Sequence, residues 1–194
     1  MNAIDVNSLT KKFGSSKAVD NISFTVEEGE IFGFLGPNGA GKSTTMMILT
    51  TLLKPTSGHA LVGGYNVVSE AKKVREKIGF VQQEISVDEF LTGRENLYLH
   101  ARINQIPRNL IKSRIDDVLE LVELGEKQDD ATLTYSGGMR KRLDIANGLL
   151  SRPAVLFLDE PTVGLDIQTR RKIWGYIRKI CKDFGMTIFI STHY

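Results

Sequence analysis

The stretch from Ile31 to Thr44, "IFGFLGPNGAGKST", decides the fold of this chain. Its first five residues carry no polar side chain, which is typical of a central strand covered on both faces. Residues 36–43 fit the pattern G-x(4)-G-K-[S/T], in which glycines let backbone N–H groups wrap around phosphates. From Thr44 to Leu53 the sequence predicts a helix that ends before Lys54-Pro55. A strand, a phosphate-binding loop and a helix in this order predict a nucleoside triphosphate site.

The loop supplies the groups that such a site needs. The N-terminus of the following helix adds about half a positive charge. We expect Lys42 to reach the β- and γ-phosphates and Ser43 to ligate Mg²⁺. The residues predicted to bind the nucleotide here are Gly36, Pro37, Asn38, Gly39, Ala40, Gly41, Lys42, Ser43 and Thr44.

A second acidic motif follows a second apolar run. Residues 154–158, "AVLFL", predict a buried strand, and Asp159 and Glu160 come directly after it. Paired acids at the end of a buried strand are costly unless a cation or a reacting water awaits them. We expect Asp159 to hold Mg²⁺ through its water shell and Glu160 to polarise the attacking water. Two solvated acids in a turn are the alternative, which the phosphate loop makes less favoured.

The remaining pattern is that of an α/β protein. The N-terminal third alternates apolar and polar residues, as in half-buried strands, and the segment from Phe90 to Gly125 is helical in pattern. Thr92 and Glu95 fit a capping box at the start of that segment. Strand–loop–helix units at both ends predict a sheet with parallel strands, and the middle third predicts a helical insertion. Further strands are expected over residues 22–26, 77–84 and 187–190, and residues 58–67 are expected to form a short hairpin around Gly63-Gly64. Helices are expected after residues 135–142, running to about Leu150, and over about residues 167–184.

Composition narrows the class of protein. The chain has 194 residues, a formal net charge of +2 and one cysteine, which excludes an internal disulfide framework and a CxxC zinc site. Near-neutral charge does not indicate a nucleic-acid or acidic-membrane partner. No apolar run approaches the about 18 residues of a membrane span, and there is no charged-then-apolar leader. We therefore expect a soluble cytoplasmic chain, which would serve a membrane only by docking to it.

Four motifs together resemble a known family. "GPNGAGKST", "YSGGM", "LFLDEPTVGLD" and "STH" occur in the order and rough spacing of ABC-type ATPase domains. The resemblance implies one ABC ATP-binding domain over residues 1–194, with a phosphate-loop NTPase (RecA-like) core and an N-terminal antiparallel β subdomain. It also implies an α-helical subdomain, inserted at about residues 86–150. "LTGRENL" and "YSGGMRKRLDIA" look most like ATP-binding subunits of the daunorubicin-resistance type. Related subunits continue well past the histidine, so we expect the chain to be truncated at its C-terminus.

The resemblance also implies residue roles. Phe13 stands where the family usually stacks a tyrosine on adenine, and phenylalanine keeps the aromatic face. Gln83 matches the loop glutamine that senses Mg²⁺ and water and faces the membrane partner. Asp166 is the acid of the loop that crosses the dimer interface. His193 matches the histidine that contacts the γ-phosphate.

The serine and two glycines in "YSGGM" form the family signature. Ser136, Gly137 and Gly138 are followed by a helix N-terminus, which is an anion site. Family geometry implies that they bind the γ-phosphate held by the other copy of a head-to-tail homodimer or heterodimer. Tyr135 and Met139 depart from the commonest form, a leucine and a glutamine, without altering these three residues. The basic run at residues 140–142 could indicate nucleic acid, but Asp144 beside it favours a solvated helix face.

The sequence therefore predicts an ATP-binding and ATP-hydrolysing subunit of an ABC transporter, with ATP and Mg²⁺ as its cofactors. The subunit is expected to act through a separate transmembrane permease, on the cytoplasmic face of the cell membrane. Subfamily resemblance favours export of drugs or other hydrophobic compounds. An ABC-type ATPase that acts on ribosomes or DNA is the alternative. A regulatory protein without turnover is disfavoured because Lys42, Asp159 and Glu160 are all present.

Overall fold

The computed structural model describes residues 1–193, which divide into two compact units. Unit 1 contains residues 1–80, residues 153–160 and residues 178–193. Unit 2 contains residues 81–152 and 161–177. Each unit has its own core and is described by itself. Within residues 1–193, no helix has the length and apolar character needed to cross a membrane.

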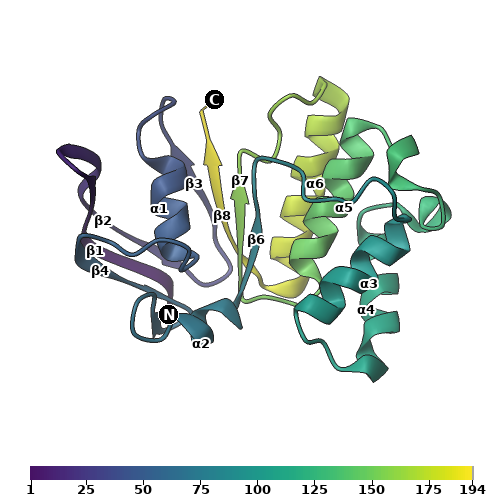
Figure 1. Ribbon diagram of the computed structural model, residues 1–194, viewed down its shortest axis with the longest axis horizontal. Helices are drawn as coiled ribbons and strands as arrows, with labels where there is room; N and C mark the ends of the chain where they lie inside the picture. The colour runs from purple at the N-terminus through teal and green to yellow at the C-terminus, as the bar shows by residue number, and fades with distance from the viewer. Residues whose placement is uncertain (194) are drawn as a thin grey trace. The chain divides into compact units, whose positions relative to one another are not determined.

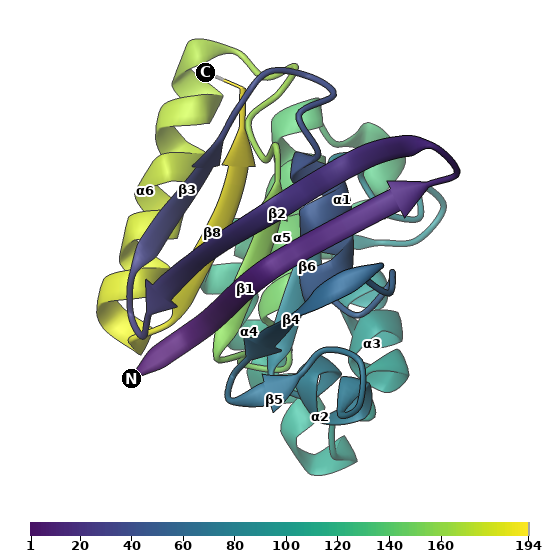
Figure 2. The same ribbon diagram turned by 90° about the vertical axis from the view of Figure 1, so that its left-hand side faces the viewer.

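The first sheet of unit 1 is antiparallel. It consists of β1 (Asn2–Phe13), β2 (Ser16–Glu27), β4 (Ser57–Val62) and β5 (Tyr65–Asn66), in the order β2-β1-β4-β5. The long β1–β2 hairpin and the short β4–β5 hairpin are visible in Figure 2. The expected strands in this region are confirmed, including the turn at Gly63 and Gly64, both of which have positive φ.

The second sheet contains the strands that lead into the phosphate-binding loop and the acidic motif. Its order is β3 (Ile31–Leu35), β8 (Thr187–Thr192), β7 (Val155–Asp159) and β6 (Ile78–Val81). β8 pairs in parallel with both β3 and β7. The expectation that residues 31–35 form a central strand is wrong, because β3 lies at the edge of this sheet within residues 1–193 and Leu35 is 66% exposed. An apolar run does not distinguish an edge strand from a central one; the fully buried strand is β7.

Helix α1 (Lys42–Leu49) lies between the two sheets of unit 1 (Figure 1). It contacts β2 and β4 on one side and β7 on the other. The helix begins two residues before the predicted start at Thr44. It also ends earlier than the predicted Leu53, because the backbone is left-handed at Thr51. Its apolar residues complete the core with β1 and with Phe157 and Phe189 of the second sheet. A short helix, α2 (Ala71–Arg75), precedes β6.

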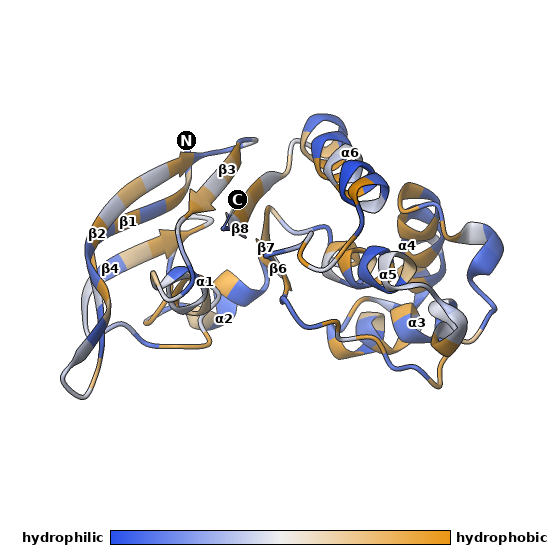
Figure 3. Cartoon of the chain, turned by 90° about the horizontal axis from the view of Figure 1, so that it is seen from above, coloured by the Kyte–Doolittle hydropathy of each residue, from blue (hydrophilic) through white to orange (hydrophobic). Residues whose placement is uncertain are grey.

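Unit 2 is mainly helical. It contains α3 (Gly93–Ile103), α4 (Arg108–Leu121), α5 (Gly137–Leu149) and the first part of α6 (Ile167–Phe184), together with short 3₁₀ turns at Gly125–Lys127 and Thr132–Thr134. The capping box is confirmed, since Thr92 Oγ1 accepts from Glu95 N and Glu95 Oε2 accepts from Thr92 N. Along α6 the colour alternates between hydrophilic and hydrophobic in Figure 3, as expected of an amphipathic helix.

The aromatic cluster in unit 1 provides a test of the core. Phe189 is fully buried, and its ring centroid lies 5.4–6.0 Å from those of four other phenylalanines. Phe189→Ala should lower the free energy of unfolding by about 3–5 kcal/mol, because it removes a buried ring and leaves a cavity. Phe184→Ala is the control: that ring is 59% exposed, so the loss should stay within about 0.5 kcal/mol. Urea denaturation measures both, and equal losses would contradict this description of the core.

Candidate functional site

The phosphate-binding loop joins β3 to α1. Gly39 and Gly41 adopt positive φ angles of 82° and 88°, and Gly41 is the N-cap of the helix. A Cβ atom added to Gly41 would lie 2.1 Å from the carbonyl oxygen of Ala18 on β2. At position 41 only glycine allows both the positive φ and the close approach to Ala18. Strand β2 therefore fixes the point at which the loop enters the helix.

Lys42 is the first residue of α1 and is only 5% exposed. Its Nζ donates to the carbonyl oxygens of Gly36 (2.7 Å) and Pro37 (3.0 Å) within the loop. The same Nζ lies 3.5 Å from Glu160 Oε1. A buried ammonium group held against the loop backbone and an acid fits the expected role of Lys42. Ser43, the next residue, is partly buried at the start of the helix.

The two acids occupy the end of β7. Asp159 and Glu160 are 7% and 9% exposed. Glu160 has a φ of 45°, a left-handed conformation that costs a residue with a side chain about 1–3 kcal/mol. Its backbone N–H donates to Ser191 Oγ (3.0 Å), and that hydroxyl donates to Asp159 Oδ1. Sequence reasoning missed Ser191; the signal was its place in "STH", on the strand next to the acids.

Glu160 also contacts the predicted histidine. His193 Nδ1 lies 2.6 Å from Glu160 Oε2, while Glu160 Oε1 faces Lys42. The carboxylate therefore lies between a lysine ammonium and an imidazole. Such a carboxylate can orient a water molecule and accept its proton as a general base, while the imidazole holds the carboxylate in place.

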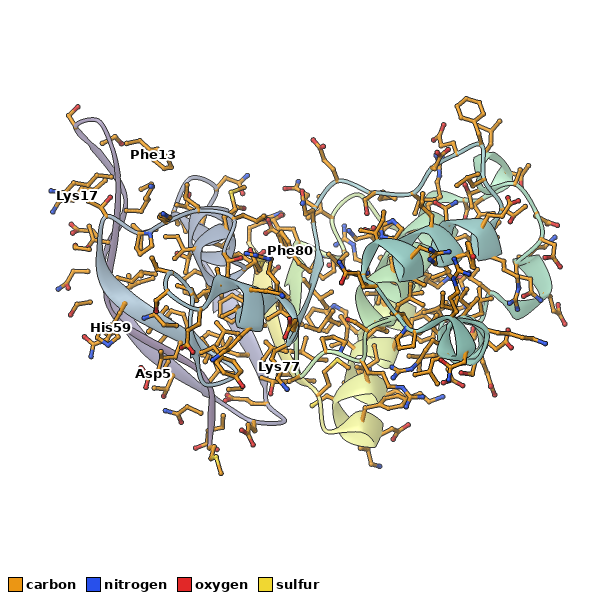
Figure 4. All side chains as sticks on the ribbon, turned by 60° about the horizontal axis from the view of Figure 1, so that its bottom comes forward. Asp5, Phe13, Lys17, His59, Lys77 and Phe80 are labelled. Atoms are coloured by element: carbon orange, nitrogen blue, oxygen red, sulfur yellow. The ribbon has the colours of Figure 1, made fainter. Side chains whose placement is uncertain are left out.

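Phe13 lies at the end of β1, next to the hairpin turn at the far end of the β1–β2 ribbon (Figure 4). Its ring is 53% exposed, and Lys11 Nζ lies 5.0 Å from the ring centroid. Lys11 Nζ also donates to the carbonyl oxygen of Lys54 (2.8 Å), which fixes its position over the ring. An exposed aromatic face of this kind can stack on a base.

The signature residues begin α5 in unit 2. Ser136 is the N-cap, and its Oγ accepts from Met139 N (3.2 Å). A Cβ atom on Gly137 would meet no heavy atom within 4 Å, whereas one on Gly138 would lie 2.7 Å from Thr169 Cγ2. The two glycines therefore differ: Gly138 is required by packing within the unit, and Gly137 faces open space.

A pocket of about 220 Å³ lies beside the signature in unit 2. Asp166 is on its wall, where Oδ1 accepts from Thr169 N (2.9 Å) and Oδ2 accepts from Thr169 Oγ1 (2.6 Å). These hydrogen bonds lower the pKa of the Asp166 carboxyl, with the side-chain bond the largest cause. The residues that line the pocket are Ser136, Gly138, Met139, Arg142, Asp166, Gln168, Thr169 and Lys172.

The expectation of a solvated basic face at residues 140–142 is wrong for Lys141. This side chain is 3% exposed, and its Nζ donates to the carbonyl oxygens of Gln82 (2.7 Å) and Gln83 (3.4 Å). It also lies 3.3 Å from Asp144 Oδ2, and Asp144 in turn accepts from Ser86 Oγ. The spacing of Lys141 and Asp144 by three residues on a helix was the sequence signal for this ion pair.

The predicted residues therefore gather in two places. Unit 1 holds the phosphate loop, Asp159, Glu160 and His193, with Phe13 on the β1–β2 hairpin. Unit 2 holds Gln83, the signature and Asp166. Two signature residues, Ser136 and Gly138, line the same pocket as Asp166.

The profile of the ABC transporter family matches residues 19–163. The chain belongs to this family. It is 42% identical over 192 residues to the daunorubicin resistance ATP-binding protein DrrA3 of Streptomyces coeruleorubidus, covering 99% of this chain and 60% of that protein. It is 40% identical over 191 residues to the linearmycin resistance ATP-binding protein LnrL of Bacillus subtilis, covering 98% and 61%. This ABC-family chain thus spans about three fifths of the length of these curated relatives.

Solved structures confirm the fold class. The chain resembles cbiO1 of Clostridium perfringens, part of the ABC transporter complex cbiONQ, with a TM-score of 0.91 and 31% identity, covering 100% of this chain and 79% of that one. It also resembles the dimeric ATP-binding cassette MJ0796 bound to ADP and Pi, with a TM-score of 0.84 and 30% identity, covering 98% and 88%. The predicted phosphate-loop NTPase fold and the resemblance to daunorubicin-resistance ATPases are confirmed.

Two glycines of the phosphate loop provide a matched test. Gly41→Ala should lower the free energy of unfolding by about 2–5 kcal/mol, since the added Cβ meets the backbone of Ala18 and the φ angle is left-handed. Gly39→Ala has the same φ strain but no atom within 4 Å, so the loss should be about 1–2 kcal/mol. Chemical denaturation without nucleotide distinguishes them; equal losses would contradict the proposed contact with β2.

Proposed function

We propose that this chain is the ATP-binding and ATP-hydrolysing part of an ABC transporter subunit that powers export through a separate membrane permease. The observation that carries the proposal is the placement of Glu160 between Lys42 and His193, beside a loop with the backbone geometry that phosphate binding needs. The family membership supports it. An ATPase acting on ribosomes or DNA is not favoured, because the reported curated relatives are resistance proteins.

ATP and Mg²⁺ fit the residues of unit 1. Within residues 1–193, no cluster of three or more His, Cys, Asp or Glu side chains could hold a metal on its own, so a cation would need phosphate oxygens as further ligands. Ser43 and Asp159 offer hard oxygen donors suited to Mg²⁺, with Gln83 as a further candidate from unit 2. When bound, Mg²⁺ would neutralise charge on the phosphates. The loop residues would hold the triphosphate, and Phe13 would stack on the adenine.

Glu160 is proposed as the group that orients and polarises the attacking water. Its carboxylate is held from one side by Lys42 and from the other by His193. His193 can keep the carboxylate oriented and contact the γ-phosphate, and Gln83 is proposed to sense the water and the cation. Because phosphoryl transfer depends mainly on positioning and on charge stabilisation, these contacts are the ones that should control the rate.

Hydrolysis is proposed to require two copies. Gly137 faces open space at the N-terminus of α5, where backbone N–H groups attract an anion. We propose that Ser136, Gly137 and Gly138 bind the γ-phosphate held by the other copy, with Asp166 in the same pocket contributing to that interface. Two ATP molecules would then lie in a head-to-tail homodimer or heterodimer.

The permease is proposed to dock on unit 2, at the cytoplasmic face of the membrane. Phe90 is 89% exposed, which is unusual for a phenylalanine, and Leu133 is also exposed. The hydrogen bond from Leu133 N to Glu89 O places Leu133 next to Phe90. Exposed apolar residues grouped in this way are typical of a protein interface. Export of a drug-like hydrophobic compound is proposed from the resistance proteins that the chain resembles.

Two substitutions should separate ATP binding from turnover. Lys42→Ala should abolish ATP binding, because it removes the buried ammonium that is proposed to bind the β- and γ-phosphates. Glu160→Gln should leave ATP binding intact and lower turnover of the assembled transporter by about 10²–10⁴-fold, the usual contribution of a general base. Equilibrium binding of a fluorescent ATP analogue and phosphate release measure the two effects. Full turnover in Glu160→Gln would remove Glu160 from the catalytic role.

The role of the signature is tested by dimerisation. In a Glu160→Gln background, Gly137→Asp should leave ATP binding to single copies unchanged and block ATP-driven dimerisation, because like charges buried together cost several kcal/mol. Gly125→Asp is the matched control, since Gly125 is also an exposed glycine of unit 2 with no atom near its Cβ position. Light scattering with and without ATP measures the mass. Normal ATP-induced dimers of the Gly137→Asp protein would refute the role across the interface.

A further inference from the structure

Ser191 lies fully buried on β8, opposite Asp159 of β7 in the parallel register. None of the four sequence motifs gives it a function, although it is the first residue of "STH". Both strands end at the proposed ATP site, and Ser191 is two residues before His193. Its hydroxyl therefore lies between two parts of the site that come from different strands.

The hydrogen bonds of Ser191 connect both acids. Its Oγ accepts from the backbone N–H of Glu160 (3.0 Å) and donates to Asp159 Oδ1. A serine hydroxyl has one proton to donate, and here that proton goes to the carboxylate. One buried hydroxyl thus orients the side chain of Asp159 and the backbone of Glu160 together.

Each bond constrains a different property of the site. The bond to Asp159 Oδ1 occupies one carboxylate oxygen and so fixes the direction of the other. The bond from Glu160 N–H holds the backbone of Glu160 at a φ of 45°, which is unfavourable for any residue other than glycine. That backbone conformation directs the Glu160 carboxylate to Lys42 and His193. If the hydroxyl is removed, a buried N–H and a buried carboxylate oxygen each lose a partner.

We propose that Ser191 is a positioning residue that aligns Asp159 for the Mg²⁺ of MgATP and Glu160 for the attacking water. The proposal rests on the proposed function of the chain as an ATPase. In this role Ser191 acts through the two acids that it hydrogen-bonds, Asp159 and Glu160. Groups that orient a metal-binding residue in this way typically change metal affinity or activity by about 10–100-fold when they are removed.

Thr187 offers a matched control on the same strand. It is 2% exposed, and its Oγ1 accepts from Gly29 N (3.0 Å), at the opposite end of β8 from the acids. Thr187→Val removes a buried hydroxyl while keeping the shape of the side chain. Any effect that arises only from losing a hydrogen bond in β8 should therefore appear in Thr187→Val as well.

The experiment compares cation binding with nucleotide binding in the full chain. Binding of a fluorescent ATP analogue in EDTA reports the nucleotide alone, and electron paramagnetic resonance of Mn²⁺ with a non-hydrolysable ATP analogue reports the cation. Ser191→Ala should bind nucleotide in EDTA within about 2-fold of wild type and bind Mn²⁺ about 10-fold more weakly. Ser191→Thr, which keeps the hydroxyl, should restore Mn²⁺ binding, and Thr187→Val should leave it unchanged.

The outcomes separate a positioning role of Ser191 from a purely structural one. If Ser191→Ala is unfolded, Ser191→Cys provides the reading, because a thiol fills the space with a much weaker hydrogen bond; it should weaken Mn²⁺ binding in the same way. Unchanged Mn²⁺ binding in a folded Ser191 variant, or an equal loss in Thr187→Val, would overturn the positioning role and leave the proposed function standing. A wild-type chain that binds no nucleotide in either assay would overturn the proposed function, and the inference with it.

Discussion

The parallel pairing of β7 with β8 is the constraint on which the rest of the site depends. This register sets Asp159 opposite Ser191 and brings His193 to Glu160. The acids are buried, so their orientation must come from protein groups rather than from bulk water. The left-handed backbone at Glu160 costs free energy, and its hydrogen bond to Ser191 offsets part of that cost. A shift of one residue in β8 would disconnect all of these contacts at once.

The two units divide the proposed chemistry. Unit 1 supplies the phosphate loop, the acids and the histidine, which are the groups proposed to hold a triphosphate and to orient the attacking water. Unit 2 supplies the signature and the exposed surface around Phe90, which are the groups that a second copy and a permease would contact. Asp144 and Lys141 join the signature helix to the loop of Gln83 within unit 2.

Short-range patterns in the sequence predicted most of the helices and strands. The loop at residues 36–43, the capping box at Thr92 and the helix over Ile167–Phe184 each depend on neighbouring residues, so a local pattern is sufficient. Contacts between distant residues were not predictable in this way. The edge position of β3, the burial of Lys141 and the bridge made by Ser191 all depend on which elements pack together. The spacing of Lys141 and Asp144 and the motif that contains Ser191 are local signals, and neither shows which elements pack around these residues.

The loop of Lys42 and the end of β7 are proposed to form one triphosphate site. Isothermal titration of the wild-type chain with ATP and Mg²⁺ tests it most directly. We expect saturable binding of one ATP per chain and no detectable binding of adenosine at the same concentrations, because the phosphate groups should make most of the contacts. Absence of saturable ATP binding, or equal affinity for adenosine, would contradict it.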